Sequence, residues 1–84
     1  MILEQIEIQD NYTFNAGGHT AVKLFIRPLT EGDLIIKIND NIYREYKSFI
    51  QGSVYLPLVL KASDALEFIT TGSVILNING EVLE

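Results

Sequence analysis

The chain has 84 residues, a formal net charge of −5 and a sequence pI near 4.7, and it contains no cysteine. The lack of cysteine excludes disulfides, thiolate metal sites and a cysteine nucleophile. The six Lys and Arg residues are spread between Lys23 and Lys61, so neither nucleic acid nor an anionic membrane surface is an expected partner.

The hydrophobic content is high for a single domain of this size. A domain spanning residues 1–84 buries only about 60–65% of the surface that its unfolded chain exposes, so a more polar composition is expected. Apolar residues nevertheless make up 48% of the chain, and the mean hydropathy is +0.21. Burial of apolar side chains against other chains explains this excess.

Neither a signal peptide nor a transmembrane helix is expected from the sequence. The first residues, Met1 to Gln5, lack the basic segment followed by an apolar run that defines a signal peptide. No run of about 18 apolar residues is present, so no transmembrane helix is expected. The cytoplasm is therefore the default expected location.

Apolar and polar residues alternate with a period of two along most of the chain, which predicts half-buried strands. The alternation is clearest in residues 20–27, 53–60 and 73–78. In chain order, the expected strands span residues 2–8, 11–15, 20–27, 33–39, 42–48, 53–60, 65–70, 73–78 and 81–84. With turn residues between these runs, the pattern predicts an all-β, antiparallel, jelly-roll-like sandwich of about eight or nine short strands.

Three turns are indicated by residue type. The Asn39-Asp40-Asn41 segment predicts a short hairpin loop, and Asn79-Gly80 predicts a type I′ hairpin turn between residues 73–78 and 81–84. Thr71-Gly72 predicts a third turn. Residues 61–68 could instead form two turns of helix, but their alternation favours a strand.

Two parts of the chain resemble each other. Val22-x-Leu24-x-Ile26 followed by Leu29-x-x-Gly32-Asp33 is echoed by Val54-x-Leu56-x-Leu58 followed by Leu60-x-x-Ser63-Asp64. Each part predicts a strand, a tight turn containing Asp, and a second strand. The echo indicates either a duplication that forms a pseudo-symmetric sandwich or repeated use of one kind of turn.

No catalytic, cofactor or metal site is expected. His19 is the only histidine and has no partner nearby in sequence that would make it a general base or a metal ligand. The oxygens of Asn39, Asp40 and Asn41 with Asp33 could ligate Ca²⁺, but the hairpin is too tight to wrap the ion. Asp33 and Asp64 could pair as the acid and base of a hydrolase, but backbone hydrogen bonds at turns explain both residues better.

An aromatic cluster is the strongest candidate for a binding surface. Tyr43, Tyr46, Phe49 and Tyr55 lie close together in the sequence around Arg44 and Lys47. Such residues form ordinary sheet packing, a protein interface, or a stacking face for sugars. The carbohydrate alternative would use Tyr43, Tyr46 and Tyr55.

The strand that contains Pro57 is predicted to lie at the edge of a sheet or to be bulged at this residue, because proline cannot donate to a ladder hydrogen bond. Tyr55 and Val59 alternate there with Leu56 and Leu58, so both faces of this strand are apolar. An open edge of this kind promotes aggregation unless a partner covers it. The full set of predicted interface residues is Phe25, Tyr43, Tyr46, Phe49, Tyr55, Val59 and Ile75.

Three segments share a recognisable pattern of turns and strands. Leu29 to Ile35 and Leu60 to Phe68 are each a turn containing Asp that leads into a strand, and Gly72 to Glu81 reads Gly-Ser-Val-x-Leu-x-Ile-Asn-Gly-Glu. This pattern resembles small β-sandwich virion proteins of tailed bacteriophages, of the head-decoration or head-fibre base type. The resemblance implies a symmetric homo-oligomer, often trimeric, attached to a larger protein shell in the virion. It implies no catalytic residue.

The expected function is therefore that of a non-enzymatic structural or assembly protein that acts through homo-oligomeric and docking interfaces. A carbohydrate-binding module is the alternative, and an enzyme using Asp33 and Asp64 is a third.

Overall fold

The computed structural model describes residues 2–50 and 52–83, and eight strands run through these residues. They are β1 (Ile2–Ile8), β2 (Asn11–Asn15), β3 (Thr20–Pro28), β4 (Gly32–Ile38), β5 (Asn41–Phe49), β6 (Val54–Leu60), β7 (Ala65–Thr70) and β8 (Val74–Val82). None of the described residues belongs to a helix that is long and apolar enough to cross a membrane.

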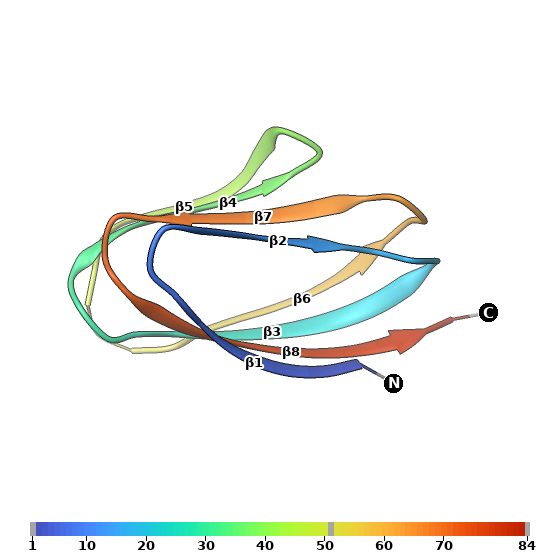
Figure 1. Ribbon diagram of the computed structural model, residues 1–84, viewed down its shortest axis with the longest axis horizontal. Coiled ribbons are helices and arrows are strands. Elements are labelled where there is room, and N and C mark those ends of the chain that lie inside the picture. Colours follow the sequence, from blue (N-terminus) through green and yellow to red (C-terminus); the bar gives the residue numbers. More distant parts are fainter. Residues whose placement is uncertain (1, 51, 84) are drawn as a thin grey trace.

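The strands form two antiparallel four-stranded sheets that pack face to face (Figure 1). Sheet A has the strand order β1-β8-β3-β6, and sheet B has the order β2-β7-β4-β5. This is the strand order of a jelly roll, in which successive strands mostly alternate between the sheets. The predicted antiparallel, jelly-roll-like sandwich is therefore confirmed.

The core lies between the sheets and is built from alternate residues of the inner strands. On β3, Val22, Leu24 and Ile26 face inward and are almost completely buried. Sheet B supplies Leu34, Ile36, Leu66 and Phe68 from β4 and β7, also with essentially no exposed surface. The period of two in the sequence thus corresponds to the pleat of each strand.

The predicted hairpin at Asn79-Gly80 is wrong. β8 continues through both residues to Val82 as one strand, so residues 73–78 and 81–84 are not separate strands. Gly80 pairs with Ile2 of β1 on one side and with Val22 of β3 on the other. Hydrogen bonding to two neighbours at this inner position of the sheet outweighs the local turn preference of Asn-Gly.

The other turn predictions are confirmed. Asn39 and Asp40 link β4 to β5 with positive φ angles of 50° and 68°, the backbone signs of a type I′ turn. Residues 71–73 connect β7 in sheet B to β8 in sheet A. The alternative helix over 61–68 does not form, because β7 occupies its second half.

The two similar segments of the sequence occupy corresponding places in the sandwich. β3 and β6 pair in sheet A with Leu24 opposite Leu56, and β4 and β7 pair in sheet B with Ile36 opposite Phe68. Each segment therefore sends its first strand to sheet A and its second strand to sheet B. A common origin of the two segments stays a prediction.

Two connections between the sheets meet at one end of the sandwich. The β3–β4 and β7–β8 connections exchange hydrogen bonds, including Leu29 N to Ser73 O at 2.7 Å and Ser73 N to Thr30 Oγ1 at 2.8 Å. Gly32 and Gly72 lie where these connections touch. A Cβ on Gly32 would lie 2.7 Å from Gly72 Cα, and a Cβ on Gly72 would lie 2.8 Å from the carbonyl oxygens of residues 30 and 31. Only glycine fits at both positions.

Candidate functional site

The outer face of sheet A carries a strip of exposed apolar side chains along β3 and β6. Phe25, Tyr55 and Val59 retain 40%, 50% and 57% of their surface, although large apolar side chains are usually buried. Their alternate neighbours face the core, so the pleat of each strand directs these three side chains outward. We call Phe25, Tyr55, Pro57 and Val59 the apolar strip.

Cross-strand pairing holds the apolar strip together. Phe25 lies directly opposite Tyr55, and their ring centroids are 4.8 Å apart. Pro57 lies opposite Lys23, and Val59 lies opposite Ala21. Aromatic pairs at this spacing add stability beyond the area that they bury, so the two rings form a preorganised contact surface.

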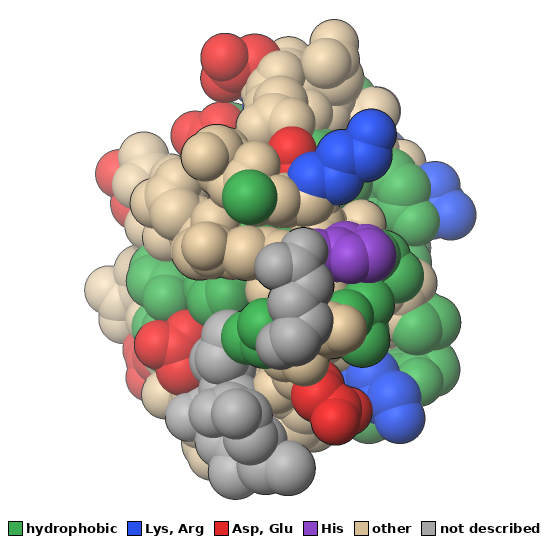
Figure 2. All heavy atoms as spheres, turned by 90° about the vertical axis from the view of Figure 1, so that its right-hand side faces the viewer, with side chains coloured by type: hydrophobic (Ala, Val, Ile, Leu, Met, Phe, Trp, Pro, Cys, Tyr) green, Lys and Arg blue, Asp and Glu red, His purple; other side chains and the backbone are tan. Residues whose placement is uncertain are grey.

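Basic side chains border the apolar strip. Lys23 and Arg27 lie two residues before and two residues after Phe25 on β3, so all three side chains are exposed on the same face of the sheet. Ile75 of β8 lies opposite Arg27 and is half-buried. It extends the apolar surface from β3 toward the middle of sheet A. The space-filling view shows hydrophobic side chains gathered on the side of the molecule where Lys and Arg side chains also lie, next to the histidine (Figure 2).

The strip reaches an open edge of the sheet, because β6 is the last strand of sheet A. The prediction that Pro57 marks an edge strand is confirmed. A proline in the middle of an edge strand discourages a further strand from pairing there, because it offers no N–H donor. A partner would therefore contact this surface mainly through side chains.

The predicted aromatic cluster is divided between the two sheets. Tyr55 belongs to the apolar strip on sheet A, whereas Tyr43, Tyr46 and Phe49 lie on β5 of sheet B. Phe49 is buried, and the two tyrosines are half-buried against the core. Tyr46 and Phe49 contact each other with ring centroids 5.7 Å apart. Tyr43, Tyr46 and Tyr55 thus do not form one stacking face.

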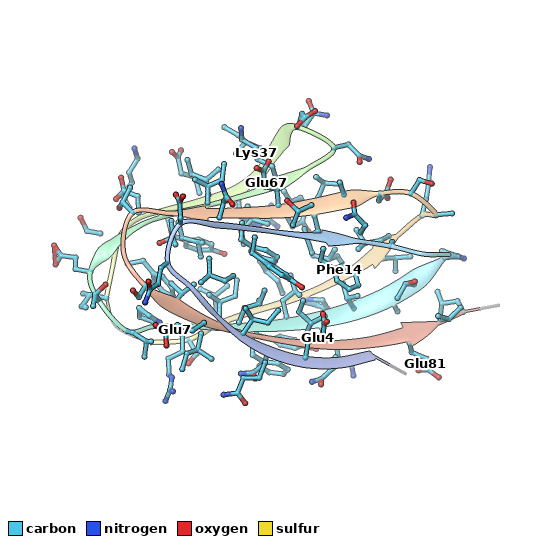
Figure 3. All side chains as sticks on the ribbon, in the orientation of Figure 1. Glu4, Glu7, Phe14, Lys37, Glu67 and Glu81 are labelled. Atoms are coloured by element: carbon cyan, nitrogen blue, oxygen red, sulfur yellow. The ribbon has the colours of Figure 1, made fainter. Side chains whose placement is uncertain are left out.

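The outer face of sheet B has a different character. Thr13, Glu67 and Lys37 lie side by side across β2, β7 and β4. Glu67 and Lys37 both point away from the core on this side of the sandwich (Figure 3). Ile35 and Ile69 also pair on this face, but both are half-buried, and the polar side chains beside them are typical of a solvated sheet face. The outer face of sheet A differs because the side chains of its apolar strip are exposed.

Asp33 and Asp64 lie at opposite ends of sheet B. Asp33 is at the start of β4, whereas Asp64 contacts the turn after β4 by accepting a hydrogen bond from Asn39 Nδ2 at 2.8 Å. Six residues of extended strand separate these ends by about 20 Å. The carboxylates therefore do not form the pair that a hydrolase would need.

Both carboxylates instead bind backbone groups at turns, as expected. Asp33 Oδ1 accepts the N–H of Ser48 at 3.0 Å, at a bulge where Ser48 has a φ of 50°. Asp64 Oδ2 accepts the N–H of Lys61 at 2.8 Å. The hydrogen bonds from Asn39 and from the Lys61 backbone lower the pKa of the Asp64 carboxyl below its usual value.

A second perturbed group lies at the β1–β2 side of the sandwich. The Tyr12 hydroxyl donates to Glu4 Oε2 at 3.5 Å and links the edges of the two sheets. Partial burial raises the pKa of Tyr12, and the charge and hydrogen bond of Glu4 raise it further. This contact keeps Tyr12 as a neutral donor.

The remaining candidate ligands do not converge. His19 is exposed in the connection between β2 and β3. Asp33 lies at the end of β4 away from the Asn39–Asn41 turn, so these residues do not surround a common point. Among residues 2–50 and 52–83, no three His, Cys, Asp or Glu side chains group as metal ligands would.

No family model matches the chain, and no curated protein matches it significantly.

Proposed function

We propose that this chain is a non-enzymatic structural protein that assembles through the apolar strip on sheet A, as a component of a tailed-bacteriophage virion. The exposure of Phe25, Tyr55 and Val59 on one face carries the proposal. An exposed apolar patch bordered by polar groups is characteristic of protein–protein contact surfaces.

The proposed role within the virion is decoration of the capsid or attachment of a fibre. The resemblance of the segments around Asp33, Asp64 and Gly72 to small virion sandwiches supports this role. A homo-oligomer, such as a trimer, would cover the apolar strip, and a larger protein shell would receive the assembled sandwich.

The test is the mass of the protein in solution. Multi-angle light scattering across a range of concentrations should give a mass above the 9.4 kDa of one chain. The double variant Tyr55→Thr/Val59→Thr keeps residues that suit a strand but removes two half-exposed apolar groups. If the exposed half of each side chain is buried in the interface, each contributes on the order of 1 kcal/mol to binding. Loss of both contributions should raise the dissociation constant roughly thirtyfold.

Ile42→Thr is the matched control. The exposed fraction of Ile42, 61%, is similar to the 57% of Val59. Ile42 lies instead at the tip of the β4–β5 hairpin, which curves away from the rest of the sandwich (Figure 1). The control should keep the mass of the unmodified protein. A monomer at all concentrations, or an equal loss from Ile42→Thr, would contradict the proposal.

A carbohydrate-binding module is the second candidate, and one observation favours it. The exposed Phe25–Tyr55 pair offers two adjacent rings on which a sugar could stack. A glycan array, followed by titration of Tyr55→Thr, tests this candidate. Binding that survives the substitution, or an array without hits, would remove it.

A further inference from the structure

The charged residues divide between the two lateral halves of the sandwich. β1 and β8 of sheet A lie beside each other, as do β2 and β7 of sheet B, so residues 2–19 and 64–83 build one half. These two segments contain no Lys or Arg. Their acidic residues are Glu4, Glu7, Asp10, Asp64, Glu67 and Glu81.

The other half consists of β3, β4, β5 and β6 and contains all six cationic side chains. These are Lys23, Arg27, Lys37, Arg44, Lys47 and Lys61. Figure 2 shows the same division, with Lys and Arg side chains on one side of the molecule and most Asp and Glu side chains toward the other. This half also contains four acidic residues, Glu31, Asp33, Asp40 and Glu45, so it is only weakly positive, whereas the half with β1, β2, β7 and β8 carries acidic side chains and no Lys or Arg.

The acidic half presents its own surface at the edge formed by β1 and β2. Glu4 and Glu7 are exposed on β1, and Asp10 is exposed in the connection from β1 to β2. Both glutamates lie on β1 (Figure 3) but point to opposite faces: Glu7 lies on the outer face of sheet A opposite Ile75, whereas Glu4 reaches the Tyr12 hydroxyl of sheet B. We call Glu4, Glu7 and Asp10 the acidic edge. It lies on the opposite side of sheet A from β6, where the apolar strip ends.

We propose that the occupant of the apolar strip is a second copy of this chain, which docks through its acidic edge in a head-to-tail arrangement. The inference rests on the proposed function and specifies the partner surface. Glu7 and Asp10 of one copy would lie against Lys23 and Arg27 of the next, at the rim of the contact made by Tyr55, Pro57 and Val59. Complementary charges of this kind select the partner surface and its orientation.

A head-to-tail contact uses different surfaces on the two copies. Glu7, Ile75 and Arg27 form one row across the outer face of sheet A, with Glu7 at the β1 edge and the strip toward the β6 edge. A contact between the strip of one copy and the acidic edge of the next is therefore heterologous, and each copy keeps one free surface of each kind. Such contacts close into a ring when the rotation between copies permits it. The molecule extends over 38 × 23 × 17 Å between Cα atoms, so its broadest side is comparable in size to the roughly 800 Å² per partner of a stable interface.

Charge reversal on each surface tests the arrangement. Lys23→Glu/Arg27→Glu reverses the border of the strip, and Glu7→Lys/Asp10→Lys reverses the acidic edge. All four side chains are exposed. Glu7 accepts a hydrogen bond from Gln9 Nε2, two residues away on the same chain segment. Each double variant should raise the dissociation constant about tenfold or more, because it places like charges opposite each other.

The decisive variant carries all four substitutions in one chain. It restores opposite charges at every head-to-tail contact, so sedimentation velocity should show the mass of the unmodified protein again. Recovery also shows that the two double variants did not simply unfold. A quadruple variant that stays dissociated, or an acidic-edge variant that assembles normally, would overturn the inference.

The test separates this inference from the proposed function. If Tyr55→Thr/Val59→Thr dissociates the assembly but reversal of the acidic edge has no effect, the strip still mediates assembly and only the head-to-tail partner is wrong. If the unmodified protein is monomeric throughout, both the inference and the proposed function fail. Added salt should weaken the assembly of the unmodified protein, since it screens exposed charges.

Discussion

The contact between Gly32 and Gly72 provides a quantitative test of how the two sheets are joined. In the variant Gly32→Ala, the new methyl group would lie 2.7 Å from Gly72 Cα, a distance that Cβ contacts essentially never show. The obstructing atoms are backbone, and hydrogen bonds between residues 29–33 and 71–73 fix them in place. The connections must therefore separate before the methyl group fits.

Overpacking of a tight site costs typically 1–3 kcal/mol, and the immobile backbone places this variant near the upper value. A loss of about 3 kcal/mol should lower the melting temperature by roughly 12–24 °C in a domain of this size. Urea denaturation followed by circular dichroism measures the free energy of unfolding directly.

Gly17→Ala is the matched control, because a Cβ at Gly17 has no atom within 4 Å. Its φ lies outside the left-handed region, so alanine should be neutral or stabilise by about 0.4–1 kcal/mol. Equal stability of Gly32→Ala and the unmodified protein would refute the close contact between the two connections. A large loss of unfolding free energy in Gly17→Ala would show that the destabilisation of Gly32→Ala does not arise from that contact.

Three further predictions concern the core and the titrating groups. Phe68→Ala should cost about 3–5 kcal/mol in urea denaturation, because Phe68 is completely buried between the sheets; a loss below 1 kcal/mol would contradict that burial. Asp64→Asn should reduce stability at neutral pH. Because the pKa of Asp64 is lower in the folded chain, its stabilising effect is complete above the unfolded value of about 3.8 and disappears as the pH falls through the folded value. The unfolding free energies of the variant and the unmodified protein should therefore converge in acid, and a constant difference down to pH 2 would show that ionised Asp64 is not the cause. Glu4→Gln should lower the pKa of Tyr12, because it removes the charge that raises it; an unchanged Tyr12 titration by NMR would exclude the contribution of Glu4.

The sequence predicted the architecture because alternating residues determine which side chains a strand buries. The alternation in β3 and β6 correctly placed Leu24 and Leu56 inside, and Phe25 and Tyr55 outside. Pro57 correctly identified an edge strand. These features depend only on neighbouring residues, because successive side chains of a pleated strand point to opposite faces of the sheet.

The orientation of the aromatic residues on β5 could not be predicted from alternation. Tyr43, Tyr46 and Phe49 all face the core, although they are spaced by three residues rather than two. Two register shifts between β4 and β5 make this possible, and Ser48 adopts a positive φ at one of them. A bulge adds a residue and reverses the alternation that follows it. The residue pattern of this segment does not predict the two bulges.

The continuity of β8 and the separation of charge both depend on long-range pairing. Asn79-Gly80 forms hairpin turns in isolated sequences, but here it lies between β1 and β3. The sequence likewise shows that its cations are confined to residues 23–61. Only the strand order brings residues 2–19 and 64–83 together as a half whose charged side chains are acidic.

The central proposal is that copies of this chain associate through the apolar strip. The most direct measurement is ¹H–¹⁵N NMR of the unmodified protein as its concentration is raised. We expect progressive shifts and broadening at Phe25, Tyr55 and Val59, with little change at Ile42 on the distant hairpin tip. Changes centred on Ile42, or spectra independent of concentration up to the millimolar range, would contradict it.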